Sequence, residues 1–333
     1  MSERRQAARD RAGRPADDLL SSSVEALAVL LDAGISPRSA WEYVAAEAAH
    51  PAVVRAATLV AAGIPPSEAL AAAAKTGRVG DGPALPARRG RVGGGGGDAG
   101  VAAVAAAWAV AEHAGASLAP ALRGAAEVLR DRAGAERHIA TALAGPRATA
   151  RLMSWLPIVG VVMAYAIGVD VIGTLVSGPL GWMAAGSGCV LLIAGRSWTR
   201  TLVRSASREG PVPGIQHDLM AIALAAGMSV PSARVTIAQV ARRIGLDAVA
   251  DGDASVDRVL RIAERAGAPA IELLSAEARQ QRRTARADGR RRAELLAVRL
   301  LLPLGVCVLP AFVLLGVVPV ILGMMSSTVA GLT

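Results

Sequence analysis

The chain has 333 residues, of which 53% are hydrophobic, 19% are charged and only 2% are aromatic. Soluble globular chains usually carry about a quarter charged residues, so this composition excludes intrinsic disorder of the whole chain and indicates contact with lipid. The formal net charge is +9, and Lys75 is the only lysine, so nearly all of the positive charge belongs to arginine. The length allows two domains of ordinary size.

The chain begins with a charged stretch. Residues 1–18 contain no apolar run that could serve as a secretory signal, and we predict that they are disordered. A first helical domain is predicted for residues 19–150. Within it, residues 76–100 include consecutive glycines and several arginines, which predicts a flexible exposed loop; contact of these arginines with phosphate is the alternative. No segment shows the sustained alternation of a strand, so the fold class is all-α.

A helix–turn–helix signature occurs in two segments. Residues 27–40 (LAVLLDAGISPRSA) align without a gap on residues 220–233 (MAIALAAGMSVPSA). In each segment an apolar helix reaches a glycine, Gly34 or Gly227, that can adopt the left-handed conformation, and a serine two residues later can cap the next helix. A similar turn is predicted at Gly63.

A second pair of turns follows in the same order. Residues 108–117 (WAVAEHAGAS) resemble residues 260–269 (LRIAERAGAP), with Gly115 and Gly267 at the turns. Two matched turns favour an internal repeat, so a second helical domain is predicted for residues 196–298. Chance similarity between alanine-rich helices is the alternative.

Two acidic residues occupy equivalent places three residues before these turn glycines. Glu112 and Glu264 stand near helix C-termini, where a carboxylate is electrostatically unfavourable. Each side chain therefore either holds the next helix or a partner, or is simply an exposed acid, and both interpretations stay open. The candidates for structural turns or partner contacts are Gly34, Gly63, Glu112, Gly115, Gly227, Glu264 and Gly267.

Three apolar segments are candidates for membrane spans. Residues 152–168 and 180–194 contain no charged side chain, and we predict that residues 152–195 form a transmembrane hairpin. The alternative is one span over residues 152–176 followed by a re-entrant piece. A third transmembrane helix is predicted at residues 300–325, where three prolines predict kinks and packing on neighbouring helices.

The arginines lie on one side of these segments. They precede the first and third predicted spans and follow the second, whereas residues 169–179 and the C-terminal tail contain no lysine or arginine. By the positive-inside rule, both helical domains and the N-terminus are cytoplasmic and the C-terminus is outside. We therefore expect a multi-pass protein of the inner (cytoplasmic) membrane, with the basic second domain facing anionic lipid headgroups.

No motif for catalysis or cofactor binding is found in the sequence. The phosphate-binding pattern of nucleotide hydrolases needs a lysine after glycine, but Lys75 follows Ala74. The four histidines form no ligand pair, and no Gly-x-Ser-x-Gly elbow lies on an α/β pattern. We expect no enzyme activity, no cofactor and no metal site.

Two helical units with these turns, each followed by apolar segments, resemble the type II secretion system F proteins. Within this family, the chain is most similar to the branch of the TadB and TadC proteins of Flp pilus assembly. The resemblance covers residues 19–325 and rests on the order of the motifs. The matched parts are residues 27–40, 63–69, 112–115, 143–147, 156–157, 178–181 and 218–304. The glycine-rich insertion, and the lack of the N-terminal spans that many Tad members possess, leave the choice between TadB-like and TadC-like open.

The resemblance implies an inner-membrane platform without catalytic residues. Such a platform contacts a cytoplasmic secretion ATPase through its helical domains and couples ATP-driven motion to pilin assembly or export. The other partners that the resemblance implies are pilin subunits and either a second platform protein or another copy of the chain.

Two other functions stay open. One is a helical membrane transporter or channel, which solute flux in liposomes would support. The other is a membrane-tethered nucleic-acid-binding protein. Aromatic residues that could stack on bases are nearly absent and acids are interspersed among the arginines, so no nucleic-acid partner is expected.

Overall fold

The structure is a computed structural model that describes residues 15–48, 50–78, 96–142, 179–206 and 212–318, together with residues 144, 145, 148 and 321. These residues are almost entirely helical and contain no β-strand, so the predicted all-α class is confirmed for this part of the chain. The chain divides into two compact units. The first comprises residues 1–137 and 209–287, and the second comprises residues 138–208 and 288–333.

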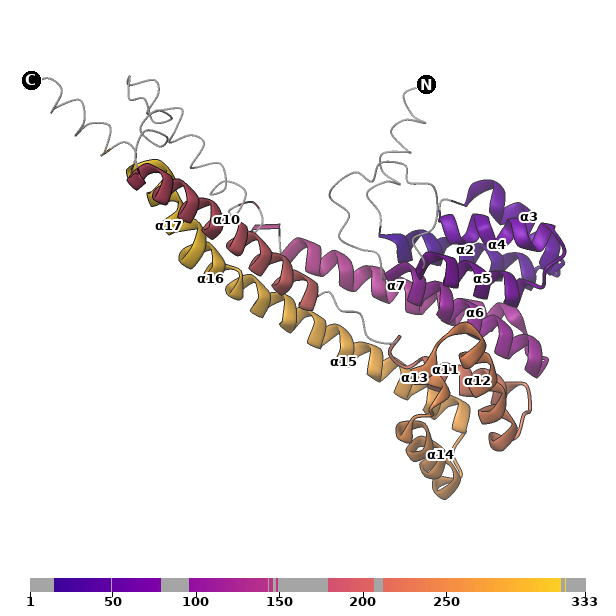
Figure 1. Cartoon of the computed structure of the whole chain (residues 1–333). Helices are drawn as coiled ribbons and strands as arrows, with labels where there is room; N and C mark the ends of the chain where they lie inside the picture. Colours follow the sequence, from indigo (N-terminus) through magenta and orange to yellow (C-terminus); the bar gives the residue numbers. More distant parts are fainter. Residues whose placement is uncertain are drawn as a thin grey trace, which may run out of the picture. The chain divides into compact units, whose positions relative to one another are not determined.

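The first unit contains helices from both segments that the sequence predicts as helical domains (Figure 1). The first group is α2 (Ala16–Asp32), α3 (Pro37–Glu47), α4 (Pro51–Ala61), α5 (Pro66–Arg78), α6 (Gly96–Ala114) and most of α7 (Leu118–Ala142). The second group is α11 (Ile215–Ala225), α12 (Val230–Ile244), α13 (Asp247–Ala250), α14 (Ala254–Ala266) and part of α15 (Ala270–Arg299). Buried residues of the two groups form one hydrophobic core.

Helix α6 lies at the centre of this unit. Every residue from Val101 to Ala111 is buried, as expected for an alanine-rich helix that is apolar all round. It packs against α2 and α5 from the first group and against α11 and α12 from the second. Its tryptophan, Trp108, lies against Trp41 of α3, with ring centroids 5.9 Å apart and ring planes tilted by 44°.

The start of α2 is held by a buried ion pair. The Asp17 side chain is 0% exposed, and its carboxylate accepts a hydrogen bond from Nε of Arg132 in α7 at 3.0 Å. Asp17 and Asp18 also lie in the first helical turn, where the helix dipole favours negative charge. These interactions explain why α2 begins at Ala16, inside the stretch 1–18 predicted to be disordered.

A close contact similarly explains why α6 begins inside the predicted loop 76–100. A Cβ atom on Gly100 would lie 2.7 Å from Oδ1 of Asp17 and 2.7 Å from Cδ2 of Leu129 in α7. The absence of a side chain thus lets α6 approach both α2 and α7. Helices occupy both ends of the predicted loop, up to Arg78 and from Gly96, and residues 79–95 lie outside the described residues.

Helix α11 begins at another close contact. Gly214, the residue before it, has φ of +79°, and a Cβ atom there would lie 2.8 Å from the carbonyl oxygen of Ala278 in α15. Both the left-handed backbone and this approach favour glycine. Farther along, the short helix α13 lies between two further glycines with positive φ, Gly245 and Gly252.

The second unit pairs two apolar helical stretches. Helix α10 (Pro179–Ala206) packs against the consecutive turns α16 (Leu301–Pro303), η1 (Leu304–Val308), α17 (Leu309–Phe312) and η2 (Val313–Val317). Small residues lie buried on both sides. They are Gly188 and Gly195 in α10, and Cys307 and Ala311 in the facing stretch. Small side chains let helix backbones approach closely, as in helix pairs within membranes.

The stretch from Leu301 to Val317 changes between α-helical and π-helical turns. The two π-helical turns, η1 and η2, each follow a proline, Pro303 or Pro310. A proline lacks the N–H group and its ring crowds the preceding turn, and wider π-helical turns are one way in which a helix accommodates such a break. Pro319, the third proline of the predicted kinked helix, lies outside the described residues.

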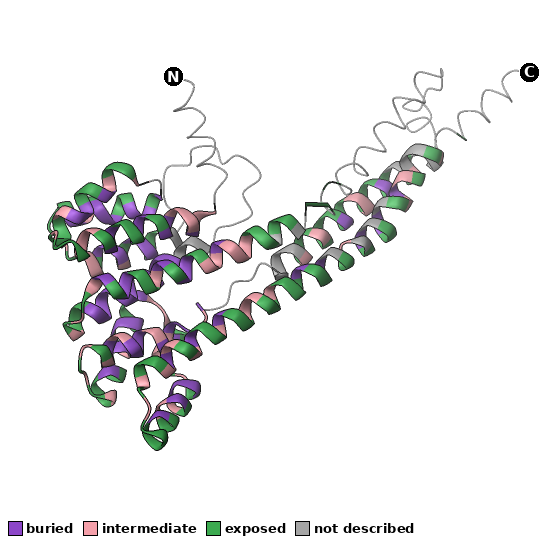
Figure 2. Cartoon of the chain, turned by 180° about the vertical axis from the view of Figure 1, so that it is seen from behind, coloured by how far each residue is buried: buried purple, intermediate pink, exposed green. Residues whose placement is uncertain are grey.

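Many residues of the second unit are exposed, as the green parts of its helices in Figure 2 show. Several of these exposed residues have large apolar side chains. They include Trp182, Met183, Val190, Ile193, Leu302, Val306 and Leu309. Within the described part of the chain, no helix combines the length and the apolar character needed to cross a membrane. The first predicted span, residues 152–168, lies outside the described residues. At the end of the third predicted span, residues 319–325, only residue 321 is described. The three spans therefore stay predictions.

The close contact at Gly214 leads to a stability prediction. Gly214→Ala should lower the free energy of unfolding by about 2–4 kcal/mol, because the new Cβ meets the α15 backbone and strains a left-handed residue. Gly124→Ala is the matched control, since this helical glycine of α7 has open space around it and the substitution should stabilise by about 0.5–1 kcal/mol. Urea unfolding followed by circular dichroism measures the stability of both variants. Equal effects of the two substitutions would contradict the close contact between Gly214 and α15.

Candidate functional site

Three glycine turns of the first unit share one geometry. Gly34, Gly63 and Gly115 have φ of +81°, +91° and +68°. In each turn the glycine N–H donates to the carbonyl three residues back and the next N–H donates to the carbonyl five residues back, over 2.8–3.3 Å. These bonds use carbonyls that the helix end leaves without partners. Each turn thus ends one helix and redirects the chain into the next.

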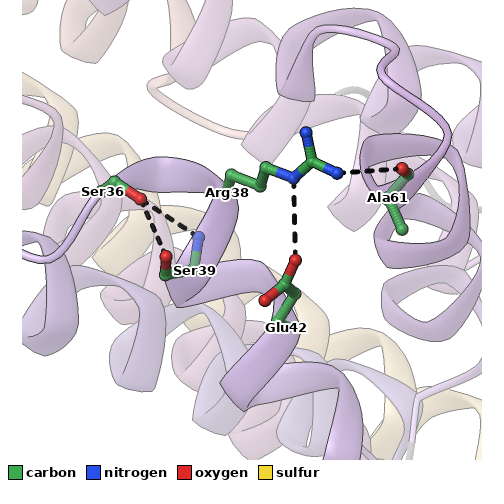
Figure 3. A network of polar contacts seen from close by, with 5 residues as sticks. All are labelled: Ser36, Arg38, Ser39, Glu42 and Ala61. Atoms are coloured by element: carbon green, nitrogen blue, oxygen red, sulfur yellow. Dashed lines mark hydrogen bonds and ion pairs between the residues drawn. The ribbon is translucent and has the colours of Figure 1, made fainter.

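Polar contacts connect the first two of these turns. The Arg38 guanidinium, one residue inside α3, donates to the carbonyl oxygen of Ala61 at the end of α4 over 3.5 Å (Figure 3). Its Nε also lies 3.7 Å from Oε1 of Glu42, one helical turn farther along α3. The start of α3, after Gly34, is therefore tied to the end of α4, before Gly63.

The third turn lies at the same end of these helices. Asp32, in the last turn of α2, forms an ion pair with Arg123 near the start of α7. Gly34, Gly63 and Gly115 are all exposed. We call the surface around these three glycines the three-turn end. Helices α2, α4 and α6 end there, and α3, α5 and α7 begin there.

The turns of the second group repeat this geometry. Gly227 and Gly267 have φ of +85° and +63°, and the same two backbone bonds measure 2.9–3.4 Å. The helix caps after the first turn of each group also agree. Ser36 accepts from the N–H of Ser39 at 3.3 Å (Figure 3), and Ser229 accepts from the N–H of Ser232 at 3.4 Å. This agreement is local, and the repeat of whole domains stays a prediction.

The two acidic candidates lie beside their turns with exposed side chains. The backbone carbonyls of Glu112 and Glu264 accept the N–H groups of Gly115 and Gly267. Among the described residues, neither carboxylate forms a hydrogen bond or an ion pair. They therefore do not hold the next helix, and Glu112 is available to a partner at the three-turn end.

A buried arginine outside the predicted site residues joins three helices of the first unit. Arg282 in α15, whose side chain is 8% exposed, lies 2.6 Å from Oδ2 of Asp218 in α11 and 3.8 Å from Oδ2 of Asp131 in α7. Arg286 pairs with Asp131 as well. A buried charge needs such partners on more than one side. The residues are far apart in sequence, so no motif indicates this cluster.

Burial has a direct electrostatic consequence for Asp218. It raises the pKa of this carboxyl group to about 6, and the charge of Glu127 acts in the same direction. The Arg282 guanidinium opposes the shift without cancelling it. The ionised form of Asp218 is therefore less favourable in the folded chain than in water.

A second buried polar contact lies next to this cluster. His217 is 0% exposed, and its Nε2 lies 3.2 Å from Oγ of Ser255 in α14, to which Gln281 of α15 donates a hydrogen bond. Burial lowers the pKa of His217 and so favours the neutral ring. A serine and a histidine in contact can act as nucleophile and base, but substrate has no access to this buried pair. Its contacts instead connect α11, α14 and α15.

No residues for holding a metal ion are brought together in the described part of the chain. It contains no group of three histidine, cysteine, aspartate or glutamate side chains with suitable positions. Cys307 is buried and Cys189 is exposed, and both are free thiols. What the site offers is therefore a set of exposed helix ends that are fixed by hydrogen bonds and ion pairs.

Residues 24–166 match the family described as type II secretion system (T2SS), protein F. This part of the chain is a type II secretion system F domain. The match begins in α2 and includes all three glycines of the three-turn end. The F domain belongs to a family of secretion and pilus assembly platforms, and the predicted family is thereby confirmed, while the Tad branch is not distinguished. No curated protein and no solved structure matches the chain.

The buried carboxyl group of Asp218 leads to a prediction for the first unit. Its pKa of about 6 in the folded chain lies above the usual 3.8, so its protonated form adds stability that is complete below about pH 4 and is lost as the pH rises through 6. The free energy of unfolding of the unchanged chain, measured relative to that of Asp218→Asn, should fall by about 1–2 kcal/mol between pH 4 and pH 7.5. This change is smaller than the pKa shift alone would give, because 29% of the Asp218 side chain is exposed and water screens its charge.

Urea unfolding of both proteins over this pH range measures the difference. Because the asparagine cannot titrate, effects of other groups cancel in the comparison. If the difference in stability between the two proteins stayed constant or rose with pH, the pKa of Asp218 would not be raised in the folded chain.

Proposed function

We propose that this chain is a non-enzymatic inner-membrane platform of a Tad/Flp-type pilus or type II secretion machine. In this proposal it couples a cytoplasmic secretion ATPase to pilin assembly or export. The observation that carries the proposal is the F domain over residues 24–166, because its family consists of such platforms. Pilin subunits and a second platform protein, or another copy of the chain, are the further partners proposed.

The three-turn end is the surface proposed for contact with the ATPase. Its turns are exposed, yet the Arg38–Ala61 hydrogen bond and the Asp32–Arg123 ion pair link the helices that meet there. A surface that is fixed before binding loses less conformational entropy when a partner docks. Such a surface can transmit movement of a motor to the helices that begin and end at it.

The surface of the second unit supports a membrane location. Apolar side chains such as Trp182, Ile193 and Leu309 are exposed there, and lipid contact would remove them from water. Arginines follow the apolar part of α10 at Arg196 and Arg200, and the end of α15 is also rich in arginine. This distribution agrees with an arginine-rich cytoplasmic side.

The proposed topology can be measured with reporter fusions. Alkaline phosphatase fused after Thr333 should be active, because the proposal places the C-terminus outside the cytoplasmic membrane, and green fluorescent protein at the same place should be dark. Green fluorescent protein fused before Met1 should fluoresce. The reverse pattern at either end, or recovery of the chain in the soluble fraction, would overturn the membrane proposal while leaving the F domain in place.

Contact with the ATPase can be tested at Glu112. Glu112→Arg reverses an exposed charge beside Gly115 without removing an internal contact, and we expect it to lower co-purification of the proposed secretion ATPase by about fivefold. Glu47→Arg is the matched control, because Glu47 is also exposed but lies at the opposite end of α3. Equal loss in the two variants would argue against the three-turn end as the contact surface.

The function itself is tested by deletion of the gene. We expect loss of pili or of secretion, with recovery on expression of the intact chain. Normal pilus assembly and secretion in the deletion strain, together with failure of the purified chain to co-isolate with the ATPase, would refute the proposed function.

A further inference from the structure

Helices α11, α12, α13 and α14 surround a pocket of about 340 Å³ within the first unit. Its apolar lining includes the buried side chains of Met220, Ile237, Val249 and Val256. This volume lies in the range of pockets that take small ligands or a few inserted side chains. Val235 at its edge is 57% exposed, so apolar surface continues from the pocket to the outside.

The same pocket has an acidic mouth. Asp251, Asp253 and Asp257 line it, and Arg234 is the one basic residue of the lining. Arg234 forms an ion pair with Asp257. The Asp251 side chain is exposed and forms no hydrogen bond or ion pair with the described residues. The lining therefore has a negative charge excess, although the chain as a whole carries +9.

Asp253 keeps its negative charge at this mouth. Burial raises the pKa of Asp253, but the hydrogen bonds from Ser255 and the charges of His217 and Arg258 together outweigh burial, so the pKa lies below its usual value. The Ser255 N–H donates to Oδ1 of Asp253 at 2.7 Å. Arg258 also lowers the pKa of Asp253 but does not line the pocket.

A hydrogen-bond acceptor is fixed at the wall of the pocket. The Gln216 Nε2 group donates to the carbonyl oxygens of Ala248 and Val249 at 2.9 and 3.1 Å. These bonds orient the amide and leave its oxygen free of bonds to the described residues. The pocket thus combines an apolar interior, an oriented acceptor and a carboxylate that has no internal partner.

The connection between α12 and α14 explains why this space is left open. It contains only the four-residue helix α13, whereas α4 and α5 lie between α3 and α6 in the first group. Arg234 follows Gly227 at the same spacing at which Trp41 follows Gly34. Trp41 fills the core with an indole ring, but the Arg234 side chain is turned to Asp257.

We propose that this pocket binds a segment of a partner protein that inserts aliphatic side chains and carries lysine or arginine beside them. The aliphatic side chains enter the apolar interior, and the basic side chain meets Asp251 at the mouth. The carboxylates disfavour anionic lipid headgroups and phosphates as occupants. This inference goes beyond the platform function and does not depend on it, because it rests on the pocket alone.

The test uses a fluorescein-labelled peptide of leucine, alanine and arginine with leucines on one helical face and arginines beside them. Fluorescence anisotropy measures its binding to the purified full chain in a non-ionic detergent, with detergent alone as the reference. Ala238→Trp fills the pocket from its α12 wall and should weaken binding at least about tenfold. Gln239→Trp, at the next and exposed position outside the lining, should leave binding unchanged.

Charge is tested with two further comparisons. Asp251→Asn should weaken binding of the arginine peptide by about threefold, and a peptide with glutamate in place of arginine should not bind detectably. Circular dichroism checks that each variant is folded. Equal binding by the two tryptophan variants, equal binding of the two peptides, or binding of phosphatidylglycerol vesicles that Ala238→Trp blocks would overturn the proposal.

Discussion

The burial of α6 on all sides is the constraint on which the first unit depends. A helix without an exposed face cannot be stable unless neighbours surround it, and no single group of helices supplies them here. Helices α2 and α5 come from one part of the chain, and α11 and α12 come from another. The two groups therefore share one core, and the exposed turns at Gly34, Gly63 and Gly115 are mounted on a scaffold that needs both.

The helix ends could be predicted from the sequence, because the chemistry that makes them is local. Gly34 and Gly227 each take a left-handed conformation and are followed by a capping serine, all within a few residues. The functions of Gly100 and Gly214 could not be predicted in this way, since each depends on a backbone or side chain that is distant in sequence. For the same reason, the matching turns do not indicate that both groups of helices pack against α6, because these contacts join residues that are distant in sequence.

The arginines have two roles, of which the sequence pattern shows only one. Their distribution along the chain predicts topology, whereas Arg132 and Arg282 are largely buried and paired with aspartates inside the first unit. Guanidinium groups suit this role because they remain charged when buried and donate hydrogen bonds in several directions. Arg282 uses this property to face Asp131 and Asp218 from different helices. Part of the positive charge is thus structural and does not face lipid or a partner.

The composition of α6 also limits how this protein can change during evolution. Along an ordinary amphipathic helix, tolerance to substitution rises and falls with each helical turn, because one side faces water. From Val101 to Ala111 no position faces water. An enlarged side chain at any of them displaces a neighbouring helix, so we expect variation in this stretch to be accompanied by changes in α2, α5, α11 or α12. Substitutions in the two groups of helices, although far apart in the gene, are in this way linked through one segment between them.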